Sequence, residues 1–219
     1  AAATVASATT TTMTVNVPVN ADLLDEINED LVFSVSSADT SNVSASTNIT
    51  ILDNDPLPGI SISDASIAEG DAGTAILTYT VSLSAPSSKA ISVNYASADG
   101  SADGSDYTAN SGTLNFAPGE TSQVVTLVVS GDTVHELDET ALVTLSAPVN
   151  ATITDASGTG TIVNDDLPHI TVSNATIVEG DAGTSLITFT VTLASASALV
   201  VSADYSTANG SANSASDYV

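Results

Sequence analysis

Residue types that carry much of protein chemistry are missing or nearly missing from this chain of 219 residues. It has no Cys and no Trp, and a single basic side chain, Lys89, stands against 26 Asp and Glu residues. Without Cys, disulfides and thiolate metal sites are excluded. The net charge of −25 argues strongly against binding nucleic acid or anionic lipid, because both require Lys and Arg.

Long apolar runs and strong helix formers are also scarce. No stretch of about 18 apolar residues occurs, so we expect no membrane span. The first twelve residues lack a basic start and an apolar core, so we expect no signal peptide in them. Val, Ile, Ala and Leu supply most of the apolar content, and Ser, Thr, Asn, Asp and Gly much of the rest. This mixture favours short strands joined by turns and predicts an all-β fold.

Segments of the chain return at a spacing of about 110 residues, which is the repeat period. "ISISDASIAEGDAGT" from Ile60 returns as "ITVSNATIVEGDAGT" from Ile170, and "ADLLDEINED" at 21–30 precedes "GDTVHELDET" at 131–140 by the same offset. Leu-Pro pairs at 57–58 and 167–168 mark short, stiff linkers between units. The repetition predicts three tandem units, which are the C-terminal half of a repeat (1–57), a complete repeat (58–167) and the N-terminal half of a further repeat (168–219).

Two arrangements are compatible with half-repeats at both ends. In the first, the chain is a segment of a longer array, cut inside a domain on either side. In the second, half-domains from different copies complete one another head to tail and form a fibre. We favour the first arrangement, because cut sandwiches would expose strand edges.

Within the complete repeat, apolar and polar residues alternate in a series of short segments. The alternation predicts strands near 60–68, 77–83, 91–95, 113–116, 122–130, 141–145 and 151–163. Seven antiparallel strands in about 110 residues indicate an immunoglobulin-like β-sandwich. We expect Tyr79, Tyr95 and Phe116 to pack in its core.

Acidic residues gather in connections that such a sandwich places at one tip. Successive antiparallel strands alternate in direction, so the connections after the first, third, fifth and seventh strands meet at the same end. These connections contain Glu69 and Asp71, then Asp99, Asp103 and Asp106, then Asp132, Glu136, Asp138 and Glu139, and finally Asn164, Asp165 and Asp166. The connections at the opposite tip carry one acid and Lys89.

Crowded carboxylates without basic partners raise one another's pKa and destabilise a fold. Calcium would neutralise them, because it accepts six to eight oxygen ligands in a flexible geometry. Zinc and copper are disfavoured, since the chain has neither Cys nor a cluster of His. Magnesium, which prefers fewer protein ligands, and an acidic tip without a bound ion remain alternatives.

The segments "IAEGDAGT", "GSDYT", "SGTLNFAPGET", "GDTVHELDETALVTLS" and "GTIVNDD" resemble the motifs of the Calx-β domain, found in sodium/calcium exchangers, integrin β4 and large bacterial surface proteins. The resemblance covers the complete repeat and both halves. It implies calcium ligands at Glu69, Asp106, Asp132, Glu136, Glu139, Asp165 and Asp166, with Asn164 at a position where the family has Asp. In the partial repeats it implies ligands at Asp22, Glu26, Glu29, Asp53 and Asp55, and at Glu179 and Asp217. Residues 1–12 depart from the family pattern, and we assign them no chemistry.

These features lead to a hypothesis of function. The chain is expected to be a calcium-binding structural module of an extracellular or cell-surface adhesin or fibre, in which Ca²⁺ rigidifies loops and interdomain joints. Its expected partners are calcium ions, neighbouring repeats or other copies, and cell-surface or matrix ligands. The alternative is a calcium-sensing regulatory domain pair, as in the exchangers.

We expect no enzymatic activity. "HELDE" at 135–139 lacks the second His of the zinc-protease pattern, and no Ser-His-Asp arrangement stands out. His135 is predicted to be a bystander in the acidic loop, and His169 a linker residue.

Overall fold

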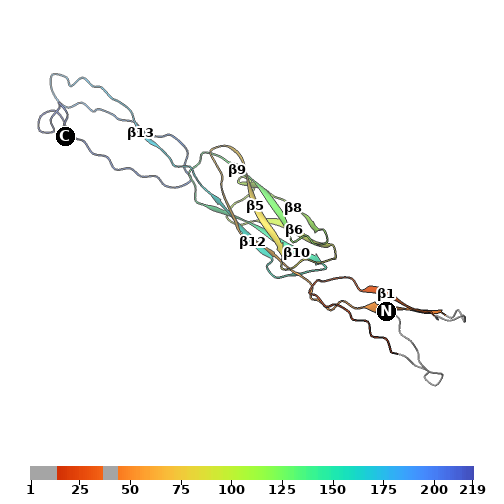
Figure 1. The fold of residues 1–219 in the computed structure, drawn as a ribbon. Helices are drawn as coiled ribbons and strands as arrows, with labels where there is room; N and C mark the ends of the chain where they lie inside the picture. Colours follow the sequence, from red (N-terminus) through yellow and green to blue (C-terminus); the bar gives the residue numbers. More distant parts are fainter. Residues whose placement is uncertain (1–13, 37–43) are drawn as a thin grey trace.

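The computed structural model of the chain describes residues 14–36 and 44–219. The segment 1–12, which departs from the repeat pattern, lies outside the described residues. Figure 1 shows three parts in a row, with a sandwich between two smaller parts. At one end lies a hairpin of β1 (Glu29–Ser36) and β2 (Ser44–Ile51), and at the other a short pair of β13 (Ile170–Val172) and β14 (Val191–Leu193).

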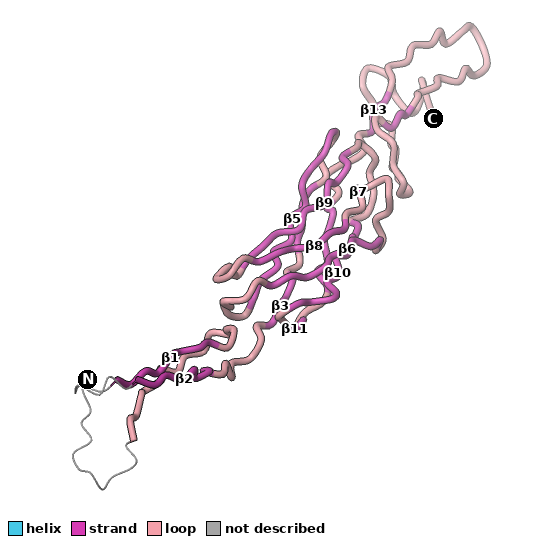
Figure 2. Tube along the Cα trace, turned by 90° about the vertical axis from the view of Figure 1, so that its right-hand side faces the viewer, coloured by secondary structure: helices cyan, strands magenta, loops and turns pink. Residues whose placement is uncertain are grey.

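The central part consists of two five-stranded sheets (Figure 2), which confirms the predicted all-β sandwich. One sheet has the order β4 (Ala65–Ala68), β12 (Ser157–Val163), β10 (Glu139–Val149), β6 (Ile91–Asp99) and β8 (Ser111–Phe116). The other has the order β11 (Thr152–Ile153), β3 (Gly59–Ile62), β5 (Gly73–Leu83), β9 (Ser122–Gly131) and β7 (Tyr107–Thr108). In the described part of the chain, no helix is long and apolar enough to cross a bilayer.

The first and last strands of the sandwich each divide between the two sheets. β3 pairs antiparallel with β5, whereas β4 runs parallel to β12 in the opposite sheet. β11 likewise runs parallel to β3. The amide of Thr159 donates to the carboxylate of Asp64 (2.7 Å) where the first strand crosses over. Two adjacent polar residues interrupt the alternation at each crossing, Ser63 with Asp64 and Thr154 with Asp155, and the prediction of single strands at 60–68 and 151–163 passed over these breaks.

The core lies between the sheets and follows the period of two expected for strands. Leu77 and Tyr79 of β5 pair with Leu127 and Val125 of β9, and all four side chains are buried. The Tyr79 hydroxyl donates to the carbonyl of Ala141 (3.3 Å), so its buried polar atom has a partner.

The expectation for the other two aromatic residues is met in different degrees. Phe116 is buried in the core, whereas Tyr95 is only partly buried and packs against its margin.

The partial repeats keep the apolar pattern of the central repeat, but their apolar side chains are not packed in a closed core. Val17, Ile187 and Phe189 each stand one repeat period from a core residue of the sandwich, namely Leu127, Leu77 and Tyr79. Their exposed fractions are 48%, 44% and 53%, respectively. Each half-repeat therefore presents one side of a core that only the central repeat completes among the described residues.

Candidate metal centre

Acidic side chains from four connections meet at the tip of the sandwich from which the chain leaves toward β13. Two groups of three residues have carboxylate oxygens that all lie within 4.8 Å of one another. The first group is Glu69, Asp165 and Asp166, and the second is Asp106, Glu136 and Glu139. These are the two such groups in residues 14–36 and 44–219, and they confirm that connections distant in sequence converge on one tip.

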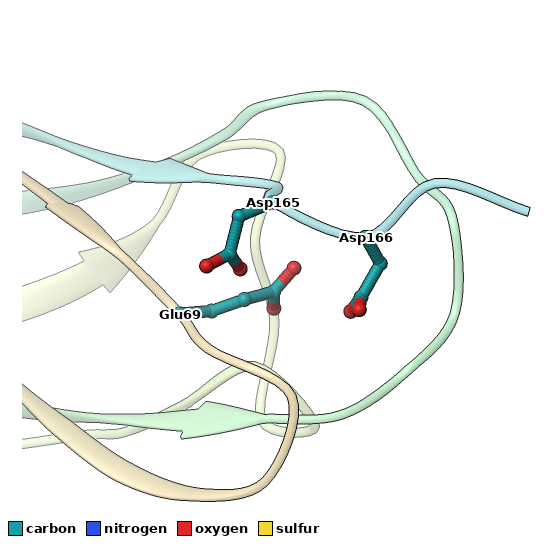
Figure 3. A group of neighbouring side chains, drawn as sticks. All are labelled: Glu69, Asp165 and Asp166. Carbon is teal, nitrogen blue, oxygen red and sulfur yellow. The ribbon is translucent and has the colours of Figure 1, made fainter.

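The first group joins the connection after β4 to the segment after β12. Figure 3 shows the carboxyl group of Glu69 lying between those of Asp165 and Asp166. Asp166 is only 8% exposed, and its Oδ2 atom has no hydrogen-bond partner. A buried carboxylate oxygen without a partner is costly unless a cation or a proton compensates it.

Backbone contacts hold the first group in place. The Glu69 amide donates to the Val163 carbonyl (3.2 Å), and the Gly70 amide donates to Oδ1 of Asp165 (3.0 Å). Gly70 has a φ of 81°, a conformation that other residues rarely adopt. A Cβ atom on Gly131 would collide with the carbonyl oxygens of Glu69 and Gly70. Glycine at 131 therefore lets the connection after β9 approach the connection after β4.

The second group draws on a tight turn that precedes β7. The amide of Asp103 donates to Oδ2 of Asp106 (2.7 Å), and Ser105 donates through its amide to Oδ1 of Asp103 (2.7 Å). The Ser130 amide donates to the carbonyl of Asp106 (2.7 Å) and ties this turn to β9. Glu139, the first residue of β10, faces the same turn.

Burial first, and neighbouring negative charges second, raise the pKa values of these carboxyl groups. Burial, with the charges of Asp132 and Glu136, raises the pKa of Glu69 to about 7. Burial and contact with Asp106 raise the pKa of Glu139 to about 7 as well. Glu136 influences both residues, so the two groups form one field of negative charge. Burial likewise raises the pKa of Asp166.

Two further predicted ligands of the central repeat lie beside these groups. Asp132 is exposed and accepts a hydrogen bond from the Val134 amide (2.6 Å). Asn164 accepts from the Glu136 amide through Oδ1 (3.0 Å), and its Nδ2 donates to the Asp166 carbonyl (2.9 Å). Asn164 thus links the acidic connections to one another.

The predicted ligands of the partial repeats have different surroundings in the two halves. Those of the first half line one open hollow of about 270 Å³, and they are Asp22, Glu26, Glu29, Asp53 and Asp55. Glu179 and Asp217 of the last half are exposed, and neither belongs to a group of neighbouring carboxylates among the described residues.

The tip also involves residues that were not named as ligands from the sequence. The charge of Asp71 helps to raise the pKa of Asp166, although Asp71 was not among the predicted ligands. His135, predicted to be a bystander in the acidic loop, belongs to neither group of neighbouring carboxylates, and its amide donates to the Ala196 carbonyl (3.1 Å) of the next repeat. Asp25 occupies the same position one period earlier and contacts Ser87. The offset of one repeat period was the signal in the sequence that paired these two positions.

Comparison with known proteins identifies the repeat. The model of the Calx-beta domain matches residues 7–55, 59–167 and 163–219, which together make up most of the chain. The chain belongs to the Calx-beta family. No curated protein sequence matches it significantly.

Solved structures similar to this Calx-beta chain include domains whose names contain Calx and CBD. CBD12 from CALX1.2 is 25% identical with a TM-score of 0.45, covering 49% of this chain and 45% of that one. The calcium binding domain CBD12 of CALX1.1 is 25% identical with a TM-score of 0.43, covering 49% and 44%. The apo-form Calx CBD1 domain is 24% identical with a TM-score of 0.42, covering 49% and 99%. The chain thus spans less than half the length of either CBD12 structure.

In the central Calx-beta repeat, the acidic tip and the exit of the chain coincide. Asp166 is followed directly by Leu167 and Pro168, which lead into the next repeat. Any ion held by Asp165 and Asp166 would therefore act on the loops and on the joint together.

Proposed function

We propose that this chain is a calcium-binding structural module of an extracellular or cell-surface adhesin or fibre, in which Ca²⁺ rigidifies the acidic tip and the joint between repeats. The observation that carries the proposal is Asp166, whose buried Oδ2 has no partner and lies beside Glu69 and Asp165. Membership of the Calx-beta family supports it.

The donor set fits calcium. Both groups offer only carboxylate oxygens, which suit a hard cation that takes six to eight oxygen ligands. Glu69, Asp165 and Asp166 would hold one ion, and Asp106, Glu136 and Glu139 another, with Asp132 close to both groups. Bound Ca²⁺ would supply the positive charge that this tip lacks. Extracellular modules of this kind typically bind calcium at about 10⁻⁴–10⁻³ M.

The proposed setting and partners follow from the same features. A Ser- and Thr-rich array of repeats suits an extended surface protein more than a compact catalyst. We propose neighbouring repeats or other copies as protein partners, and cell-surface or matrix molecules as ligands. We propose no enzymatic role, because "HELDE" lacks the second His of the zinc-protease pattern and no Ser-His-Asp arrangement stands out in the sequence.

Thermal unfolding with and without calcium tests the proposal. We expect excess Ca²⁺ to raise Tm relative to EDTA, because binding to the native state alone adds stability. Asp166→Asn removes the buried charge and should abolish most of the calcium-dependent increase. Asp155→Asn, at an exposed position in the connection between β11 and β12, is the matched control and should keep it.

Equal Tm values in Ca²⁺ and EDTA would rule out the proposed module. A calcium titration separates the structural role from the sensor alternative. Saturation in the submillimolar to millimolar range supports the extracellular module, whereas micromolar affinity would favour the regulatory domain pair.

A further inference from the structure

The two joints between repeats use the same pair of positions. Asp25 and His135, which stand one repeat period apart, each lie in the acidic connection of one repeat. Each forms an isolated parallel bridge with the following repeat, Asp25 with Ser87 and His135 with Ser197. Ser87 and Ser197 are separated by the same period. The contact therefore recurs in step with the sequence.

The backbone contacts at the two joints correspond as well. The Ser88 amide donates to the Asp25 carbonyl (3.0 Å), and the Ala198 amide donates to the His135 carbonyl (3.0 Å). Within each turn the serine hydroxyl accepts from the amide two residues later, Lys89 in one (3.0 Å) and Leu199 in the other (3.1 Å). The turn thus has the same internal hydrogen bond in both repeats where it contacts the preceding loop.

The side chains at the two joints differ. Asp25 is only 2% exposed, and its carboxylate accepts from the Ser87 hydroxyl (2.6 Å) and the Lys89 ammonium (2.7 Å). The same ammonium lies 3.5 Å from Oδ2 of Asp53, in a different segment of the preceding repeat. At the second joint, Nδ1 of His135 lies 3.2 Å from the Ser197 hydroxyl, and Leu199 replaces the lysine.

We propose that residues 87–89 and 197–199 are receptors for the acidic connection of the preceding repeat, and that the third receptor residue sets how firmly each joint is held. Lys89 fixes the first joint by bridging Asp25 and Asp53, whereas Leu199 leaves the second joint to its backbone and serine contacts. The partner that fits the Lys89 receptor is an acidic tip that carries Asp at the position of Asp25.

Physical reasons favour a strong contribution from Lys89. It is the only Lys or Arg in the chain, and its ammonium contacts Asp25 and Asp53 of the preceding repeat. The Asp25 carboxylate is buried at the joint, so it is screened weakly by salt, and removal of Lys89 would leave a buried charge without its ion partner. Since this contact requires no metal, it can be measured in EDTA, separately from the calcium proposal.

Distance measurements between spin labels test the first joint in the full chain. Because the chain has no Cys, Thr47→Cys and Asn115→Cys introduce two labels on exposed strand positions either side of that joint. In EDTA we expect Lys89→Leu to broaden the distance distribution. Lys89→Arg retains the charge and is the matched control, which should keep the distribution narrow.

The second joint allows the reverse experiment. Labels at Thr126→Cys and Thr192→Cys span it, and both positions are exposed. The double substitution His135→Asp and Leu199→Lys introduces the ion pair of the first joint. We expect this double variant to narrow the distribution in EDTA, and neither single substitution to do so.

Each outcome decides the inference. Broadening with Lys89→Leu but not Lys89→Arg, together with narrowing in the double variant, supports it. Unchanged distributions at the first joint, or equal broadening by both Lys89 variants, would overturn it. Repeating the distance measurements with Ca²⁺ separates the two proposals. If Ca²⁺ leaves the distance distributions unchanged while the Lys89 variants behave as expected, only the calcium-binding function is contradicted.

Discussion

At the scale of single residues, the acidic tip is a set of carboxyl groups held closer than their charges favour. Asp166 is buried with an oxygen that has no partner, and Glu69 and Glu139 have pKa values of about 7. Nothing in the sequence around any of these three residues marks it as different from the other acidic residues. Their unusual state arises because backbone contacts, such as that of Gly70 with Asp165, bring separate connections together.

The raised pKa values predict how the metal-free protein responds to pH. The pKa of Glu69 and of Glu139 rises from 4.5 to about 7 in the folded state. The folded protein therefore retains protons that the unfolded chain has lost, and this stabilising contribution is complete below pH 4.5. It is lost as pH rises through about 7. In EDTA we expect Tm to fall between pH 5 and pH 8.

Excess Ca²⁺ provides the control for that experiment. A bound cation favours the ionised carboxylates, so the fall in Tm between the same two pH values should diminish or reverse. A metal-free Tm that rises over this range would contradict the raised pKa values of Glu69 and Glu139.

At the scale of elements, glycine positions allow strands and connections to approach closely. Gly131 ends β9 where its backbone passes the carbonyl oxygens of Glu69 and Gly70. Gly160 of β12 similarly faces the hydroxyl of Tyr79, where any Cβ would collide. The Gly131 contact decides how near two of the acidic connections can come to one another, and the Gly160 contact how near β12 lies to the core side chains of β5.

Gly131→Ala is therefore expected to disturb the tip. Its Cβ must displace the backbone of the connection after β4, and such overpacking typically costs about 1–3 kcal/mol. We expect a lower free energy of unfolding in denaturant titrations and weaker calcium binding. Gly104→Ala is the matched control, because no atom lies within 4 Å of its added Cβ and its φ is not positive. Equal stability of the two variants would contradict the close approach.

At the scale of the whole molecule, repeats follow one another in a row (Figure 1). At each joint the acidic connection of one repeat contacts the following repeat. Without bound cations, the negative charges of neighbouring repeats repel one another most strongly where the acidic tip meets the next repeat, because the net charge is −25. The Lys89 contact and the proposed calcium sites oppose this repulsion at different places. Stiffness of the array is thus expected to depend on the ions available.

Small-angle X-ray scattering can check this dependence. We expect EDTA to produce a profile of greater interdomain flexibility than Ca²⁺, with NaCl adjusted so that ionic strength and general screening are matched. Indistinguishable scattering profiles in the two conditions would show that calcium does not stiffen the joints.

The sequence by itself determined the all-β class, the repeat period and the gathering of acids at one tip. These features depend on local alternation and on the order of strands, which are visible along the chain. The domain boundaries and the assignment of individual ligands stay predictions.

Only the tertiary structure decided which residues meet across long separations. It divided the first and last strands between two sheets, grouped Glu69 with Asp165 and Asp166, and gave Asn164 the role of linking connections. It also placed Asp25 and His135 against the following repeat. No local pattern encodes these contacts, because they arise from how close two backbones can pass and which side chains lie between them.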